Sequence, residues 1–220
     1  MSAQPLPGKF ITVEGSEGVG KSTNMAFIEA FLRDRKLSVK VTREPGGTPL
    51  AETIRELLLQ QRQERVDPTA ELLLMFAARA QHLNTVIIPA LQQGQWVLCD
   101  RFTDSTYAYQ GGGRAMDTAV ISQLEQLVQG ERQPDLTLYL DIDVQQGLAR
   151  ATRRAQLDRF EAEQIDFFER VRACYLDRAR YYSQRYRVID AEPPLAVVQT
   201  HIARELTAFV DAVNHSVLVQ

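Results

Sequence analysis

The sequence predicts an α/β fold in which a five-stranded parallel sheet lies between two layers of helices, a three-layer sandwich. Five short apolar runs are typical of buried strands, and they cover Phe10 to Glu14, Val39 to Arg43, Trp96 to Asp100, Leu136 to Asp141 and Arg187 to Asp190. Helical patterning separates each run from the next, and this alternation favours a parallel sheet covered on both faces. All five runs end in a charged residue. Because the carboxyl ends of parallel strands meet at one edge, we expect the functional site there.

The segments between the runs carry apolar residues at helical spacing. In chain order they are Asn24 to Leu32, Thr48 to Gln60, Thr69 to Gln93, Val144 to Arg154, Phe160 to Tyr182 and the terminal stretch His201 to Gln220. Residues 155–161 interrupt the periodicity after a basic helical turn. We therefore expect one domain over residues 1–220, with a separate lid segment at about residues 150–161.

Composition limits the class of protein. The chain has 220 residues, 45% of them apolar, and a formal net charge of −3, so its charge favours neither nucleic acid nor an anionic membrane. Residues 1–9 lack the layout of a signal peptide, and no apolar run approaches a membrane span. We expect a cytoplasmic protein in which Cys99 and Cys174 are reduced packing residues, and in which the few Cys and His residues form no metal centre.

The most specific motif is a phosphate-binding loop. The run G-x-x-x-x-G-K-[ST] consists of Gly15, Ser16, Glu17, Gly18, Val19, Gly20, Lys21 and Ser22. A strand that feeds such a loop points backbone N–H groups at a polyphosphate, Lys21 reaches the β and γ oxygens, and the Ser22 hydroxyl can ligate Mg²⁺. The alternative is a glycine-rich turn that matches by chance, but a strand pattern precedes the motif and a helix pattern follows it. We predict a nucleoside triphosphate site.

Two groups of basic residues are candidates for phosphoryl transfer, which needs charge neutralisation more than covalent chemistry. Arg101 follows Asp100 at the end of the third run, where the pair can offer a carboxylate to metal-bound water and a guanidinium to a phosphate; the alternative is a local ion pair. Arg150, Arg153 and Arg154 share one helix face, with Arg159 nearby. A solvated face is the alternative, but the phosphate loop contains no arginine, so this segment could supply an arginine finger.

Three other segments suit a nucleotide acceptor. Residues 42–48 form a Pro-Gly-Gly turn between a strand and a helix, with Thr48 as a candidate N-cap. Residues 102–109 contain both aromatic and hydroxyl side chains, and we expect a second turn over residues 110–114. Aromatic rings beside hydroxyls and an amide suit a base and a sugar. Met75 and Phe76 lie four and three residues before Arg79, so all three can project to one side, either as core or toward a base.

Taken in order, these segments resemble the bacterial thymidylate kinase family over nearly the whole chain. The matching pieces are Glu14-Gly15 with the phosphate loop, Thr42 to Thr48, Phe76 to Arg79, Asp100 to Phe102, Tyr107 to Arg114 and Val188 to Pro194. The resemblance implies the nucleoside monophosphate kinase branch of the P-loop NTPase fold. It also implies transfer of the ATP γ-phosphoryl to dTMP with Mg²⁺, giving dTDP and ADP for dTTP biosynthesis, by a homodimer.

The resemblance also implies roles for single residues. ATP would be held by the phosphate loop with Arg150, Ala191 and Pro194, and Mg²⁺ by Ser22 and Asp100. Catalysis would use Lys21, Arg101 and a lid arginine, either Arg153 or Arg154, while Glu14 would approach the sugar 3′-hydroxyl or metal water. The acceptor residues would be Arg43, Pro45, Arg55 and Arg101 near the phosphate, Arg79, Ser105, Thr106 and Gln110 at thymine, Tyr109 under the deoxyribose, and Met75 or Phe76 over the base.

Two other functions remain open at this point. A related kinase for another nucleoside monophosphate or for a deoxynucleoside would keep the phosphate loop and the lid and differ in the acceptor pocket. A nucleotide-dependent switch would transfer nothing to a small acceptor. Such a switch normally carries an Asn-Lys-x-Asp guanine signature, which the sequence lacks.

Overall fold

The structure, a computed structural model, describes residues 8–151, 159–160 and 163–218. Its centre is a five-stranded sheet of order β2-β3-β1-β4-β5. The strands are β1 (Phe10–Glu14), β2 (Val39–Arg43), β3 (Trp96–Asp100), β4 (Leu136–Asp141) and β5 (Tyr186–Asp190). All pairings are parallel, with Thr12 of β1 opposite Cys99 on one side and Thr137 on the other. The predicted strands are confirmed, with β5 beginning one residue earlier than expected.

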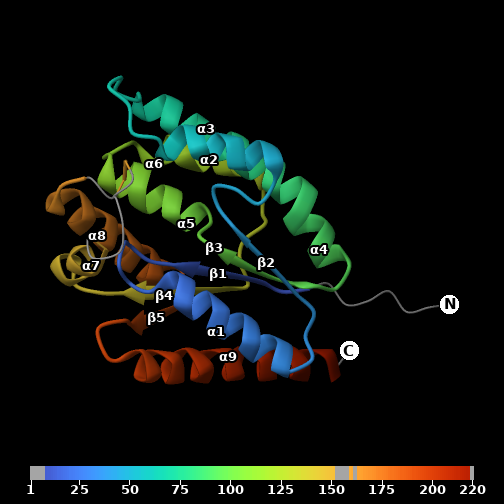
Figure 1. Ribbon diagram of the computed structural model, residues 1–220. Helices are drawn as coiled ribbons and strands as arrows, with labels where there is room; N and C mark the ends of the chain where they lie inside the picture. Colours follow the sequence, from blue (N-terminus) through green and yellow to red (C-terminus); the bar gives the residue numbers. More distant parts are fainter. Residues whose placement is uncertain (1–7, 152–158, 161–162, 219–220) are drawn as a thin grey trace.

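Helices cover both faces of the sheet, as predicted (Figure 1). The layer formed by α1 (Lys21–Asp34) and α9 (Leu195–Leu218) lies below the sheet in that view. The upper layer contains α2 (Pro49–Leu59), α3 (Pro68–His82), α4 (Ile88–Gln92), α5 (Thr103–Thr106) and α6 (Thr118–Val128). Two further helices, α7 (Val144–Ala151) and α8 (Ile165–Tyr181), lie together at one end.

The alternation of side chains along the strands builds the two cores. Phe10 and Val97 pack with Leu83 above the sheet, whereas Ile11 and Leu98 pack with the buried face of α1 below it. Each fully buried apolar side chain of this size contributes about 1.5–3 kcal/mol relative to exposure. The cores therefore hold the sheet rigid, and its carboxyl edge can position a site.

Some helix boundaries differ from the prediction. Thr48 does cap α2, because its side chain accepts a hydrogen bond from the Ala51 N–H at 3.1 Å. The long pattern over residues 69–93 is divided into α3, a π-helical turn η1 (Leu83–Ile87) and α4. Pro89 is the second residue of α4, and its ring and missing N–H disturb the α-helical ladder at this point. Helix α8 begins at Ile165, later than the apolar pattern, and α9 begins at Leu195, before the predicted start.

The prediction of a turn over residues 110–114 is wrong. The chain instead continues from α5 into a π-helix, η2 (Tyr107–Gly113). The glycines there serve close packing against α8: a Cβ on Gly112 would lie 2.8 Å from the Arg170 carbonyl oxygen, and one on Gly113 would collide with the Phe167 ring. Gly112 and Gly113 therefore let η2 and α8 touch, and the glycine run does not reverse the chain.

Both cysteines are free, with Cys99 buried and Cys174 half-buried, in agreement with the expected packing role. Among the described helices, none is long and apolar enough to cross a membrane.

Candidate functional site

The phosphate loop leads from β1 into the N-terminus of α1. Gly15, Gly18 and Gly20 all have positive φ, a conformation that glycine adopts without steric cost. The first turn of α1 carries no acidic residue and no side-chain cap, so its N–H groups and dipole are suited to an anion. The Lys21 Nζ donates to the carbonyl oxygens of Gly15 and Ser16 at 3.0 and 3.1 Å, and this keeps the ammonium beside the loop.

The backbone of the phosphate loop also contacts the backbone of α7 directly. A Cβ on Gly18 would lie 1.9 Å from the carbonyl oxygen of Gly147 in α7, and a Cβ on Gly147 would lie 2.7 Å from the carbonyl oxygen of Glu17. These two glycines therefore let α7 pack directly on the phosphate loop.

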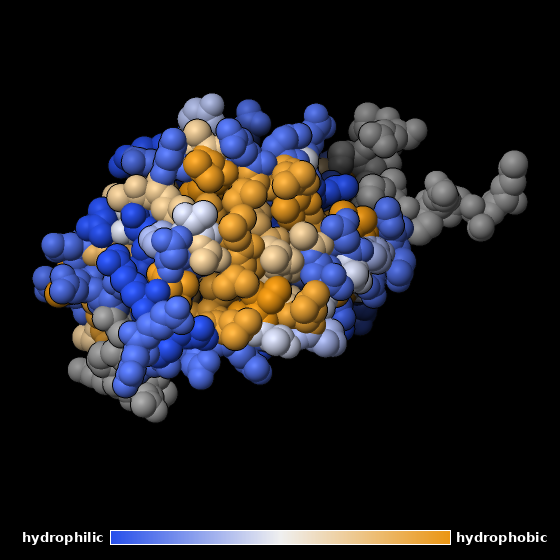
Figure 2. All heavy atoms as spheres, turned by 90° about the horizontal axis from the view of Figure 1, so that it is seen from above, coloured by the Kyte–Doolittle hydropathy of each residue, from blue (hydrophilic) through white to orange (hydrophobic). Residues whose placement is uncertain are grey.

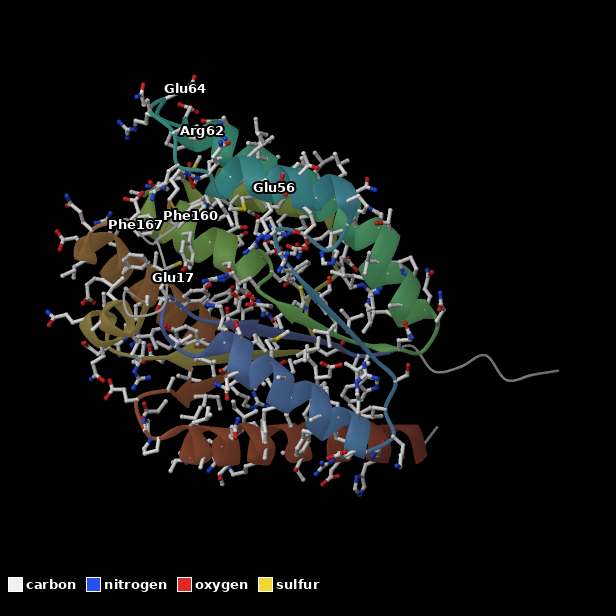
Figure 3. All side chains as sticks on the ribbon, in the orientation of Figure 1. Glu17, Glu56, Arg62, Glu64, Phe160 and Phe167 are labelled. Atoms are coloured by element: carbon white, nitrogen blue, oxygen red, sulfur yellow. The ribbon has the colours of Figure 1, made fainter. Side chains whose placement is uncertain are left out.

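A cavity of about 300 Å³ opens beside the loop. Its walls come from the phosphate loop, the β2–α2 loop, α3, the end of β3 and the α5–η2 segment. Glu17 from the loop and Phe160 from the lid side both line it (Figure 3). Its described charged residues are four cations and three carboxylates, namely Lys21, Arg55, Arg79, Arg101, Glu17, Glu44 and Asp100. This local excess of positive charge, in a chain of net charge −3, suits an anionic ligand.

Arg101 is the centre of the hydrogen-bond network in this cavity. Its Nη2 donates to Glu17 Oε1 at 3.0 Å and to the Tyr109 hydroxyl oxygen at 2.9 Å, and its Nη1 donates to Ser105 Oγ at 3.2 Å. The guanidinium carbon lies 4.8 Å from the centre of the Tyr109 ring. Burial opposes ionisation of Glu17, but Arg101 and Lys21 outweigh that effect and lower its pKa. Arg101 therefore forms its ion pair with Glu17 of the phosphate loop, and the alternative of a local pair with Asp100 is not what the structure shows.

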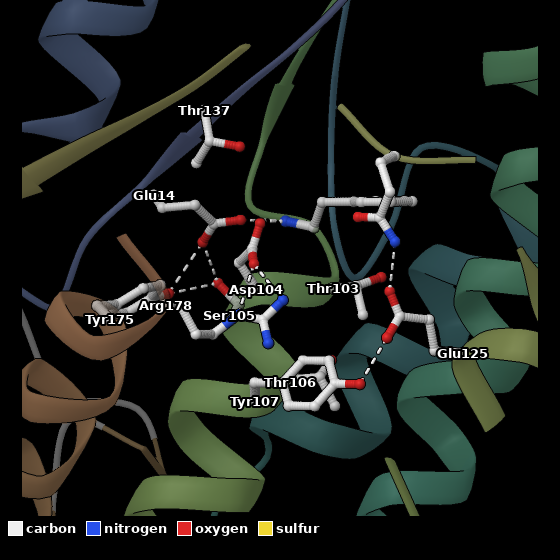
Figure 4. A network of polar contacts seen from close by, with 12 residues as sticks. Glu14, Thr103, Asp104, Ser105, Thr106, Tyr107, Glu125, Thr137, Tyr175 and Arg178 are labelled. Carbon is white, nitrogen blue, oxygen red and sulfur yellow. Dashed lines mark hydrogen bonds and ion pairs between the residues drawn. The ribbon is translucent and has the colours of Figure 1, made fainter. Parts of the chain in front are cut away.

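Glu14 lies behind this cavity, and the described residues that line the cavity do not include it. Its carboxyl group accepts from the Phe102 N–H at 2.7 Å, the Ser105 hydroxyl at 2.6 Å and the Tyr175 hydroxyl at 2.9 Å (Figure 4). Burial, with the nearby Asp104 carboxylate, raises the pKa of Glu14 to about 7. In this structure Glu14 holds Ser105 and the Phe102 backbone in place, and its approach to a sugar hydroxyl or to metal-bound water stays a prediction.

Asp104 anchors the same region from below (Figure 4). Its carboxylate pairs with Arg178 at 2.6 Å and with Arg185 at 2.8 Å. Although burial opposes ionisation, these two cations lower the pKa of Asp104 to about 2. The pairs join α5 to α8 and to the residue before β5, so the helix that carries Ser105 is held at two points.

The end of β3 offers oxygen atoms that fit a divalent cation. Asp100 lines the cavity, and its buried Oδ1 has no hydrogen-bond partner among the described residues. Ser22 lines the same cavity, and carboxylate and hydroxyl oxygens are the donors that Mg²⁺ prefers. Within the described ranges no cluster of three or more His, Cys, Asp or Glu residues could form a metal centre.

The far end of the cavity is lined by Met75, Arg79, Thr106 and Gln110. Arg79 Nη2 donates to Thr106 Oγ1 at 3.0 Å, and Gln110 Nε2 donates to Glu71 Oε1 at 2.8 Å. Phe76 instead packs into an apolar cluster with Leu72, Tyr107 and Ile121. Of the two residues left open by the sequence, Met75 is the one that faces the cavity.

The arginines of the β2–α2 region separate into two positions. Arg55 lines the cavity and donates to the Pro45 carbonyl oxygen at 2.9 Å. Burial, with Arg43 nearby, lowers the pKa of Arg55. The Arg43 side chain is 54% exposed and pairs with Glu52 at 2.8 Å, outside the described cavity lining. The structure therefore brings Pro45 and Arg55 to the site but leaves Arg43 at its margin.

A second hollow, of about 450 Å³, lies on the other side of the phosphate loop. It shares Gly18, Val19 and Gly20 with the first cavity, and its remaining described lining includes Arg150, Ala191 and Pro194. Arg150 donates to the carbonyl oxygens of Ala191 and Glu192 at 3.0 and 3.1 Å. Two sites thus meet at one phosphate loop. The lid candidates Arg153 and Arg154 lie outside the described residues.

Sequence reasoning missed two residues that organise the site. Tyr175 of α8 contacts Glu14, Ser105 and Arg101, although its place in an apolar helical pattern is typical of core. Glu71 of α3 is buried and binds Gln110, together with two arginines, Arg114 and Arg159. A glutamate on the same helical stripe as Met75 and Arg79 was the signal available for Glu71.

A parallel sheet of this order, with a phosphate loop after β1 and two hollows that meet at the loop, defines a P-loop nucleotide kinase. The family model described as Thymidylate kinase matches residues 13–202. The chain belongs to the thymidylate kinase family.

Several relatives carry the same description. The chain is 65% identical over 204 residues to a thymidylate kinase of Teredinibacter turnerae, covering 93% of this chain and 100% of the relative. It is 58% identical over 207 residues to one of Ectopseudomonas mendocina, covering 94% and 99%. The solved structure of a thymidylate kinase from Ehrlichia chaffeensis matches with a TM-score of 0.75 at 34% identity, over 91% of this chain and 100% of that one.

Proposed function

We propose that this protein transfers the γ-phosphoryl group of ATP to dTMP, forming dTDP and ADP, with Mg²⁺ as cofactor. The main support for this proposal is that the two hollows share Gly18, Val19 and Gly20. A donor in the hollow beside Arg150 and an acceptor in the cavity beside Arg101 would therefore present their phosphates to the same loop. Such positioning converts a bimolecular transfer into a step within one complex.

The chemistry assigned to the protein is charge neutralisation. Lys21 and the N–H groups of the phosphate loop hold the donor phosphates, while Arg101 and Arg55 hold the acceptor phosphate. Ser22 and Asp100 would hold Mg²⁺, which supplies further positive charge to the transferring group. Arg153 and Arg154 remain the candidates for a lid arginine.

The acceptor end of the cavity favours a thymine-like base. Arg79 can donate to a carbonyl at C4, while Gln110 and Thr106 add hydrogen-bonding groups beside it. Met75 covers the base with a polarizable apolar side chain. The Tyr109 ring, held between Arg101 and Phe160, lies against the sugar and excludes a 2′-hydroxyl sterically.

A homodimer and a cytoplasmic location complete the proposal. Exposed apolar side chains gather on one face of α2, α3 and α6, which Figure 2 views directly. They include Leu50, Leu57, Leu73, Val120 and Leu127, the last of them 79% exposed. A contiguous apolar patch of this kind supports burial against a second copy. The two free thiols fit a reducing compartment.

The test is a coupled assay of ADP release with ATP, Mg²⁺ and a panel of acceptors: dTMP, dUMP, UMP, dCMP, dGMP and AMP. Strong preference for dTMP supports the whole proposal. Preference for another monophosphate would keep the kinase and refute the acceptor assignment. ADP release that does not depend on an acceptor would refute the transfer and favour a nucleotide switch.

A further inference from the structure

A buried chain of polar side chains stands directly behind Arg79. Arg79 Nε donates to Glu44 Oε2 at 2.7 Å, and the other carboxylate oxygen of Glu44 lies 3.0 Å from His82 Nδ1. His82 Nε2 in turn lies 2.6 Å from Thr42 Oγ1. The exposed fractions are 3% for Arg79, 3% for Glu44 and 0% for His82. The acceptor assignments described above use Arg79 but none of the three residues behind it.

The hydrogen-bond roles along this chain are determined by chemistry. A carboxylate only accepts, so His82 Nδ1 carries a hydrogen and donates it to Glu44. In the neutral ring, Nε2 then accepts from the Thr42 hydroxyl, and both ring nitrogens are satisfied. The Gly47 backbone packs closely against the His82 ring and the Thr42 hydroxyl, because a Cβ on Gly47 would collide with the imidazole and lie 2.7 Å from Thr42 Oγ1. Both oxygens of Glu44 are therefore held at fixed positions.

Fixing Glu44 fixes the direction of the Arg79 guanidinium. Glu44 binds Nε, Thr106 binds Nη2, and the rings of Phe76 and Phe102 lie 4.8 and 5.2 Å from the guanidinium carbon. The third nitrogen, Nη1, is buried and has no hydrogen-bond partner among the described residues, although Arg79 lines the cavity. Nη1 is thus the donor left to meet a ligand.

We propose that His82 is a positioning residue for base selection, acting through Glu44 to aim Arg79 Nη1 at the C4 substituent of the acceptor base. The inference rests on the proposed function, in which Arg79 contacts the base. A fixed cationic donor accepts a carbonyl at C4 and rejects an amino group, which is itself a donor. A guanidinium that can turn away loses that discrimination. Selectivity for dTMP over dCMP is therefore the property that His82 controls.

The experiment compares His82→Leu with His82→Asn. Leucine fills the volume but has no donor for Glu44, whereas the asparagine amide can donate from a position close to that of Nδ1. Steady-state kinetics with dTMP and with dCMP give the ratio of the two kcat/KM values. We expect His82→Leu to lower this ratio about tenfold, equivalent to about 1.4 kcal/mol, mainly through KM for dTMP. His82→Asn should restore the ratio to within about threefold of the parent chain.

A purely structural role for His82 predicts a different result. In that case His82→Leu would lower the melting temperature while the dTMP to dCMP ratio stayed unchanged, and the proposal would be refuted. If His82→Leu does not fold, Thr42→Val decides by the same ratio, since it removes only the hydroxyl that orients the ring; Thr42→Ser is its matched control.

A parallel Arg79→Ala variant tests the role of His82 separately from the proposed recognition of the base by Arg79. If Arg79→Ala leaves the ratio unchanged, Arg79 does not read the base, and both the base assignment and the role of His82 fail. If Arg79→Ala collapses the ratio but His82→Leu and Thr42→Val do not change it, the base assignment stands and the role of His82 alone is refuted.

Discussion

Replacing Glu14 with glutamine should abolish a loss of stability that the folded chain suffers as the pH rises. Burial first, and the Asp104 carboxylate second, raise the pKa of Glu14 to about 7. The unfolded chain releases this proton near the ordinary glutamate value, so between the two pKa values the unfolded state holds fewer protons than the folded state. The contribution of Glu14 is then fully present below about pH 4.5, declines toward pH 7 and is absent above it.

The local hydrogen bonds reduce this shift without reversing it, because the Ser105 and Tyr175 hydroxyls donate to Glu14 and lower its pKa. Glu14 Oε2, Ser105 Oγ and Tyr175 Oη form a triangle with sides of 2.6, 2.7 and 2.9 Å. The glutamine side chain keeps an oxygen that can accept from these hydroxyls and carries no titrating proton.

The magnitude follows from the two pKa values. The shift from 4.5 to about 7 corresponds to about 3 kcal/mol, at about 1.4 kcal/mol for each pH unit. Asp104 does not interfere, because its pKa of about 2 lies below the range in which Glu14 titrates.

The assay is urea unfolding of the parent chain and Glu14→Gln at intervals from pH 4.5 to 8. Subtracting the two free energies of unfolding removes the titration of all other groups. The difference should fall by about 3 kcal/mol from pH 4.5 to 7 and stay level above it. Glu64→Gln, at an exposed position in the α2–α3 loop (Figure 3), is the matched control. Parallel curves for the parent chain and Glu14→Gln would refute the reasoning.

Three further predictions concern the site and the exposed face. Arg101→Ala should lower kcat/KM for dTMP by at least about 100-fold. Arg101→Lys should recover only part of this activity, because lysine lacks the guanidinium fork. Unchanged steady-state kinetics in Arg101→Ala would exclude a role of Arg101 in phosphate binding. Tyr109→Ala should reduce the preference for the deoxy over the ribo acceptor about tenfold. Tyr109→Phe should preserve this preference, since it keeps the ring and loses only the hydroxyl that binds Glu17. An equal loss of preference in both variants would rule out the steric explanation. Leu73→Asp should convert a dimer to a monomer in light scattering, and a monomeric parent chain would show that the apolar face has another role.

Local sequence rules predicted the parts of this protein whose signals are local. The phosphate loop is one continuous motif, and each strand is a short apolar run, so both were placed correctly from the chain alone. The cap at Thr48 belongs to the same category, because its partner is the Ala51 N–H three residues away.

Other features depend on contacts between distant segments. Three successive glycines are typical of a turn, and only their packing against α6 and α8 explains why they continue a helix in η2. The choice between Met75 and Phe76 depends on the exact rotation of α3, which apolar spacing does not determine. Tyr175 and Glu71 are further cases, since their partners lie on other elements.

The contact between Gly18 and Gly147 limits how this protein can change. In most packed interfaces a larger side chain on one surface can be compensated by a smaller one opposite. Here neither surface has a side chain to shorten, because a Cβ on either glycine meets a carbonyl group of the other segment. The two positions therefore have no compensating pair of substitutions. The spacing between the phosphate loop and α7 is set by the two backbones and not by side chains, so changing it would require a different path for one of the two backbones.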